Sequence, residues 1–259
     1  MADMTDRKDR AADSEPRMRP RWTATAIYAV AMAWMEAAVV LYLRTLSNRI
    51  VPYQADPLPD QWPALGLAEL VREAATMVML AAVGWLAGRN FRARFGYFLV
   101  AFGLWDIFYY VFLRVLTGWP HSLLDWDVLF LIPVPWWGPV IAPALIALLM
   151  VATGSLMAHP FFDRNPWRPS RAALAACALG ALAALYAFMA DALPRIGEGV
   201  EALRKVLPER FLWGVYLLGL VGMAAPAADL ALRMLRGNRV SEANPEAERA
   251  GRVSRPRCP

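Results

Sequence analysis

The sequence predicts an all-α integral membrane protein with about six transmembrane helices. Of its 259 residues, 58% are hydrophobic and only 19% are charged, which is far from the composition of soluble globular domains. The charged residues also gather in residues 1–21, in residues 235–259 and in a few short connections. Long apolar runs remain between them, and runs of about 20 residues are long enough to cross a bilayer as helices.

Six apolar runs are the predicted spans. They cover about residues 24–45, 66–87, 96–117, 136–158, 171–192 and 211–235. They divide the chain into a polar cytoplasmic tail (1–22), a six-span helical membrane domain (23–236) and a disordered, basic cytoplasmic tail (237–259). Because no small-residue cleavage site follows the first apolar run, we expect that run to be retained as a span.

Lys and Arg residues are distributed unequally between the two sides that six spans define. With the N-terminus inside, nineteen of them flank the inner side and six flank the outer side. The positive-inside rule therefore predicts a bacterial inner (cytoplasmic) membrane protein with both termini cytoplasmic. The same distribution explains the basic pI, so nucleic acid is not expected as a partner. The lipid bilayer is the expected partner, together with other membrane proteins or further copies of the chain.

Prolines punctuate the stretch that leads into the fourth span. They are Pro133, Pro135, Pro139 and Pro143. Each proline within a helix removes a backbone hydrogen bond, and irregular backbone at membrane depth requires a protein or water-filled surrounding. We therefore expect a short re-entrant or interfacial segment followed by a proline-broken fourth span. A plain kink with aromatic anchors is the alternative.

The connection between spans five and six has a helical pattern. Apolar residues recur there at Ile196, Val200, Leu203 and Leu207, and charged residues occupy the opposite face. This spacing predicts an amphipathic helix that lies on the outer surface of the membrane.

Acidic residues lie deep within the first three predicted spans. Glu36, Glu73 and Asp106 fall at a similar depth in the outer half of the bilayer under the predicted topology. An ionisable group at the centre of a spanning helix costs about 2.5 to 3.5 kcal/mol, so these acids should face the interior of the bundle. Tyr110 and Arg114 follow Asp106 at four-residue spacing and extend it into a stripe. These five residues form the predicted ion- or proton-binding site.

The charge balance of these spans is uneven. Glu69 should pair with Arg72, which leaves the three deeper acids facing Arg114 alone. A cluster of this kind must hold protons, bind a cation or open onto water. In the alternative, the acids only neutralise the two arginines and hold the helices together.

A second group of polar residues follows the third span. His121 could join Glu36, Glu73 and Asp106 as a tentative metal ligand, so a metal ion or another cation is the expected cofactor class. The lip of the cavity should be formed by Asp125, Asp127, Pro133 and Pro135. The alternative for either aspartate is a simple cap on the following helix.

Three functions remain open on the sequence. The sequence contains no GxGxxG, Walker A, HExxH, CxxC or GxSxG motif. The leading hypothesis is cation or proton binding in the transport of a small solute or ion. The alternatives are a membrane-embedded, metal-dependent enzyme acting on a lipid-soluble substrate and an accessory subunit of a membrane complex.

Overall fold

Six long helices make up most of the protein in the computed structural model, which describes residues 18–46, 62–130, 134–164, 168–199, 202–203 and 206–243. They are α2 (Met18–Leu46), α3 (Trp62–Ala87), α4 (Phe91–Thr117), α5 (Ile141–Ala158), α7 (Arg171–Met189) and α9 (Trp213–Ala243). Each contains an apolar segment long enough to cross a membrane. The prediction of a six-span, mostly helical membrane protein is therefore confirmed.

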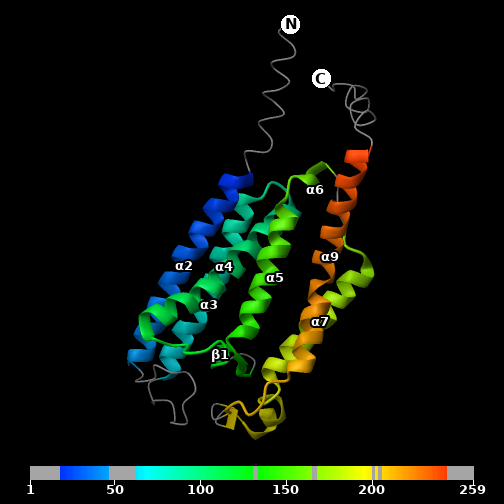
Figure 1. Cartoon of the computed structure of the whole chain (residues 1–259). Helices are drawn as coiled ribbons and strands as arrows, with labels where there is room; N and C mark the ends of the chain where they lie inside the picture. Colours follow the sequence, from blue (N-terminus) through cyan, green and yellow to red (C-terminus); the bar gives the residue numbers. More distant parts are fainter. Residues whose placement is uncertain are drawn as a thin grey trace.

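The helices form two groups (Figure 1). In the first, α4 packs against α2, α3 and α5, and in the second, α7 packs against α9, which in turn contacts α5. The start of α2 and the end of α9 lie at the same end of the molecule, which we call the terminal end (Figure 1). A short helix α6 (Phe161–Arg164) lies in the connection between α5 and α7, at this same end.

Glycines allow the closest helix contacts. A Cβ added at Gly154 on α5 would lie 2.9 Å from the backbone nitrogen of Val100 on α4, and a Cβ at Gly96 would lie 2.7 Å from the carbonyl oxygen of Gly154. Gly180 and Gly219 make an equally close contact between α7 and α9. Small residues at helix interfaces are the usual means of close packing in membranes, where helices gain little from the hydrophobic effect.

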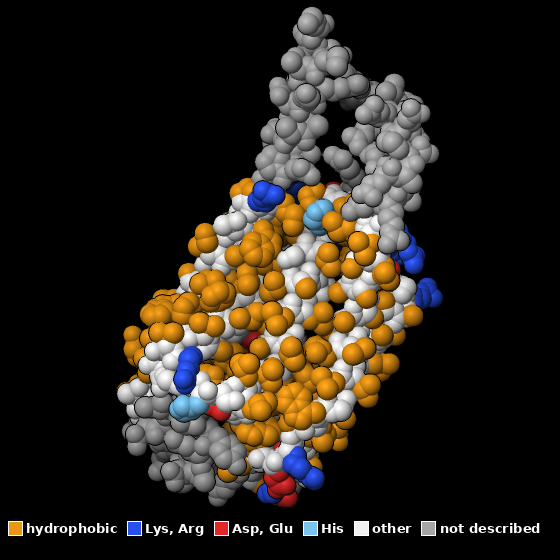
Figure 2. All heavy atoms as spheres, viewed as in Figure 1, with side chains coloured by type: hydrophobic (Ala, Val, Ile, Leu, Met, Phe, Trp, Pro, Cys, Tyr) orange, Lys and Arg blue, Asp and Glu red, His pale blue; other side chains and the backbone are white. Residues whose placement is uncertain are grey.

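Large apolar side chains cover the outside of the bundle. Leu86 is 82% exposed, Phe91 79% and Leu218 75%. Figure 2 shows hydrophobic side chains over the middle of one face and the visible basic side chains toward its two ends. A soluble monomer rarely exposes so large an apolar surface, so this belt is the surface that contacts lipid.

A β-hairpin precedes α5 at the end of the molecule opposite the termini (Figure 1). Strand β1 (Trp126–Phe130) pairs antiparallel with β2 (Trp136–Pro139). Two further backbone hydrogen bonds continue the pairing, from Val140 N–H to the Asp125 carbonyl (3.0 Å) and from Ile141 N–H to the Leu123 carbonyl (2.8 Å). The aromatic and β-branched residues of this segment favour strands.

The prolines lie mostly outside the fourth long helix, so the predicted break within the span is not confirmed. Pro135 directly precedes β2, Pro139 ends it, and α5 then runs from Ile141 to Ala158. Pro143 lies in the first turn of α5, where the N–H that proline lacks has no helical partner in any case. Pro133 falls outside the described residues.

Other predicted boundaries differ at the ends of the bundle. Helix α9 continues to Ala243, beyond the predicted start of the C-terminal tail at residue 237, and α2 begins at Met18, before the predicted end of the N-terminal tail. In the connection between α7 and α9, Leu193–Glu198 form the 3-10 helix η1. Beyond it, residues 200, 201, 204 and 205 of the predicted amphipathic helix lie outside the described residues, so that helix stays a prediction.

Candidate functional site

A cavity of about 350 Å³ lies between α2, α3, α4 and α5, under the hairpin. Its lining residues on the helices lie mostly in the later halves of α2 and α4 and the earlier halves of α3 and α5, next to the hairpin. Its walls include the predicted site residues Glu36, Glu73, Asp106 and Tyr110, and also Asp127 from the predicted lip. The structure therefore brings together acids from three helices and from β1, although they are far apart in the sequence.

Arg72 of α3 is the centre of one ion-pair network in this cavity. Its guanidinium pairs with Glu36 of α2 and with Glu69 one turn earlier on α3. The second contact with Glu69 is a hydrogen bond of 2.8 Å from Arg72 Nε. Thr76 adds a longer hydrogen bond of 3.4 Å to Glu36. A forked guanidinium satisfies two carboxylates in this way and ties α2 to α3.

Asp127 of β1 is the centre of a second network. Its carboxylate accepts hydrogen bonds from the Tyr110 hydroxyl (3.0 Å) and from the Val128 N–H (3.0 Å), and it lies 3.5 Å from Arg44 of α2. The Arg44 guanidinium also lies 4.5 Å from the ring centroid of Trp119. Burial raises the pKa of Asp127 above its ordinary value, and these three partners offset part of the shift. The network holds the hairpin against α2 and α4.

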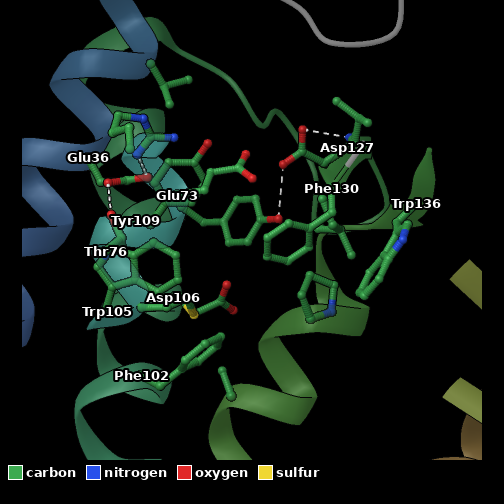
Figure 3. Close-up of a pocket in the computed structure, with 18 of the residues that line it drawn as sticks. Glu36, Glu73, Thr76, Phe102, Trp105, Asp106, Tyr109, Asp127, Phe130 and Trp136 are labelled. Carbon is green, nitrogen blue, oxygen red and sulfur yellow. Dashed lines mark hydrogen bonds and ion pairs between the residues drawn. The ribbon is translucent and has the colours of Figure 1, made fainter. Parts of the chain in front are cut away.

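Two acids in the cavity remain outside these networks. Figure 3 shows the carboxyl groups of Glu73 and Asp106 pointing into the space between the helices and the hairpin. Asp106 Oδ2 is buried and has no hydrogen-bond partner in the part of the chain that the structure describes. Glu73 feels the charge of Arg72 without forming an ion pair with it. Buried polar atoms are normally satisfied, so an orphaned carboxylate oxygen facing a cavity needs an explanation.

Aromatic rings form much of the cavity wall. Along α4, the ring centroids of Phe102 and Trp105 are 5.5 Å apart, and those of Trp105 and Tyr109 are 6.3 Å apart. Across the cavity, Phe130 and Trp136 of the hairpin meet edge to face at 5.1 Å. The indole nitrogens of Trp105 and Trp136 are buried, and neither has a hydrogen-bond partner among the described residues. The cavity is therefore apolar, with a few converging polar groups.

Arg114 lies outside the cavity. Its guanidinium donates hydrogen bonds to the carbonyl oxygens of Gly118 and Pro120, beyond the end of α4. A step of four residues advances about 40° beyond one full helical turn, so the stripe that begins at Asp106 has rotated away from the cavity by Arg114. Gly118, with a φ of 75°, ends the helix in the left-handed conformation that favours glycine. The cavity acids therefore lack the counter-ion that the sequence had suggested.

Of the described residues that were predicted to form the lip of the cavity, some line the cavity and others do not. Asp127 lines the cavity, whereas Asp125 accepts a hydrogen bond of 2.7 Å from the His121 N–H and does not line it. Pro135 also lies outside the lining, and Pro133 is not among the described residues. Asp125 thus stabilises the turn before the hairpin. This local structural role is closer to the capping alternative than to a role in the cavity.

His121 does not join the tentative metal ligands. Its side chain is 71% exposed and lies 3.5 Å from the Asp125 carboxylate, outside the cavity lining. Among the described residues, no group of three or more His, Cys, Asp or Glu side chains is arranged to hold a metal ion. The donor set that the metal hypothesis requires is therefore not assembled within that part of the chain.

Sequence reasoning missed Arg44 as part of the site, because it lies at the end of the first span and was assigned to the outer connection. A usable signal was present. Arg44 follows Glu36 by two helical steps of four residues, with Val40 between them, and all three residues line the cavity. The pairing of β1 with β2 has a weaker signal in the aromatic and β-branched residues of the segment, whereas the prolines indicate only an irregular segment.

Comparison of the chain with family models, with curated proteins and with solved structures finds no match. The fold and the site themselves define the class, which is a six-helix membrane protein with an acid-lined cavity between four of its helices.

Proposed function

We propose that this protein binds a cation or protons at Glu36, Glu73 and Asp106 and uses that binding to transport a small solute or ion across the membrane. One observation carries the proposal: Glu73 and Asp106 point into a cavity between membrane-spanning helices without an ion-pair partner in the described chain. Ionisable residues at membrane depth are expensive, and those that face a cavity commonly mark an ion or proton pathway.

The coupling follows from the charge requirement of the cavity. A carboxylate in an apolar surrounding is stable only when it holds a proton or a cation. Glu36 is compensated by Arg72, whereas Asp106 is not compensated by any described side chain. Arrival of a cation at Asp106 therefore displaces a proton, and departure of the cation takes a proton back. Such an exchange links the movement of protons to that of a second solute.

We propose a bacterial inner membrane, with both termini cytoplasmic and the cavity in the outer half of the bilayer. Arginines near the terminal end of the bundle support this orientation. They are Arg19, Arg21, Arg89, Arg92, Arg94, Arg168, Arg171, Arg233 and Arg236. The opposite end has Arg44, Arg114, Arg195 and Arg210, which is the asymmetry that the positive-inside rule describes.

Proton movement in liposomes tests the proposal. The purified chain is reconstituted into liposomes with a pH-sensitive dye and sodium, potassium or tetramethylammonium inside, and the liposomes are diluted into buffer without that cation, so that exit of the cation draws protons in. Liposomes with wild-type protein should acidify several times faster than empty liposomes. Asp106→Asn and Glu73→Gln should remove this difference, because neither amide exchanges a proton.

Glu198→Gln is the matched control. Glu198 is exposed and, within the described part of the chain, pairs only with Arg195, at 3.9 Å, so the same loss of a carboxylate should leave proton entry unchanged. Size-exclusion profiles of all variants report whether they fold. Wild-type liposomes that acidify no faster than empty ones with any of the three cations would contradict the proposal. Loss of folded protein in both cavity variants would favour a structural role for the acids.

A further inference from the structure

We infer that the cavity binds an organic cation, with a positively charged amine at Asp106 and Glu73 and an apolar body against the aromatic wall of α4. The inference rests on the proposed function and specifies its solute. It combines the charge of the cavity, the chemistry of its walls and its size.

The charge of the cavity calls for a cation. Five carboxyl side chains but only two guanidinium groups line it among the described residues. Both guanidinium groups are engaged, since Arg44 lies 3.5 Å from Asp127 and Arg72 pairs with Glu36 and Glu69. Glu36 and Glu69 share one guanidinium group, and the two acids that pair with neither guanidinium group, Glu73 and Asp106, point into the open space (Figure 3).

The walls favour an organic cation over a metal ion. Ca²⁺ takes about six to eight oxygen ligands, and Mg²⁺ requires near-octahedral coordination, whereas no group of three metal-binding side chains is assembled among the described residues. A substituted ammonium needs only one or two carboxylates and is attracted by aromatic faces. Phe102, Trp105 and Tyr109 form a continuous row of rings along the same helix as Asp106.

The size of the cavity agrees with this class. Its volume of about 350 Å³ is at the lower end of the range of about 300 to 1,000 Å³ for pockets that enclose small organic ligands. An amine with one aromatic ring or a short alkyl body fits this space. A bare inorganic ion would leave most of the aromatic wall without a contact.

Calorimetry with a defined pair of probes tests the inference on the full purified chain in detergent. The probes are benzyltrimethylammonium and neopentylbenzene, which has the same shape but a carbon in place of the charged nitrogen. The heat of each probe with empty micelles is subtracted. We expect the wild-type protein to bind the cation at least tenfold more tightly than the neutral probe.

Four variants locate the cation. Asp106→Asn should weaken binding of benzyltrimethylammonium at least tenfold, and the exposed-site control Glu198→Gln should leave it unchanged. Trp105→Leu should weaken binding about tenfold through loss of the ring face. Trp105→Phe, which keeps a ring, should retain most of the affinity, and this retention also shows that the packing at Trp105 tolerates substitution.

The inference is overturned if the wild-type protein does not bind benzyltrimethylammonium, if it binds the neutral probe equally well, or if folded Asp106→Asn keeps full affinity. These failures are distinguishable from failure of the proposed function. Proton entry into liposomes without binding of the probe would leave the transport proposal standing and reject the ligand class. Binding of the probe without proton entry would support the ligand class and reject the transport proposal.

Discussion

Removal of the Arg72 guanidinium should destabilise the protein more than any single change among its carboxylate partners. Arg72 pairs with Glu36 on α2 and with Glu69 on its own helix. Arg72→Met keeps much of the side-chain volume but leaves both carboxylates without a positive partner. Glu36→Gln, in contrast, leaves Arg72 paired with Glu69 and preserves an acceptor for Thr76.

The magnitude follows from burial. Loss of one partner from a buried ion pair costs about 3 to 5 kcal/mol. The side chains of Arg72 and Glu36 are 22% and 11% exposed, so we expect about 3 kcal/mol, at the lower end of that range. By the size scaling of soluble proteins, this corresponds to a fall in Tm of roughly 6 to 12 °C. Glu36→Gln should cost about 1 kcal/mol, the value of one hydrogen bond.

A double-mutant cycle measures the coupling. Thermal unfolding in detergent is followed by tryptophan fluorescence for the wild-type protein, for both single variants and for the double variant Glu36→Gln/Arg72→Met. The double variant should be more stable than Arg72→Met alone, because it no longer contains an uncompensated Glu36. The coupling should be about 1 to 2 kcal/mol. Additive effects, or an Arg72→Met variant as stable as wild type, would refute the reasoning.

Three further changes probe the hairpin and the helix packing. Tyr110→Phe removes the buried hydrogen bond to Asp127, so it should lower stability by about 1 to 3 kcal/mol and speed amide exchange in β1; unchanged exchange would contradict the role of this contact. Because burial raises the pKa of Asp127 in spite of Arg44, the folded state retains a proton that the unfolded state releases. The free energy of unfolding should therefore fall as pH rises from the ordinary aspartate range through the raised pKa. Denaturant titrations across this window should show that the free energy of unfolding depends less on pH in Asp127→Asn than in the wild-type protein. An equal pH dependence in the two proteins would count against the assignment. Gly154→Ala should lower Tm because its Cβ would meet α4, whereas Gly214→Ala, with open space around it, should raise stability by up to about 1 kcal/mol; equal Tm changes in the two variants would argue against close packing of α4 on α5.

The spans and the acidic site could both be predicted from the sequence for the same reason, which is the free-energy cost of placing charged groups in lipid. Charged residues are excluded from long apolar runs, so the runs locate the helices, and the exceptions within them locate the cavity. Glu36, Glu73 and Asp106 were found in this way, and the structure places all three in the cavity lining.

The partners of these acids depend on tertiary contacts, which a single sequence does not specify. Arg72 could pair with Glu69 by local spacing, yet its second partner, Glu36, comes from another helix. The stripe rule failed for Arg114, because a helix of 3.6 residues per turn rotates away from a strict four-residue repeat over two steps. The same four-residue spacing holds over two steps on α2, where Glu36, Val40 and Arg44 all line the cavity, so spacing alone does not decide which residues of a stripe reach the site.

The hairpin was not predicted, for a different reason. Four prolines indicate where a helix cannot run, but they do not say what replaces it. The structure shows that the replacement serves the site, because β1 brings Asp127 to Tyr110 and Arg44 while the hairpin aromatics face the wall of α4. Asp127 in this way engages one of the two guanidinium groups of the cavity. Since Arg72 is engaged by Glu36 and Glu69, the proposed function assigns the compensation of Asp106 to a proton or a ligand rather than to a described side chain of the protein itself.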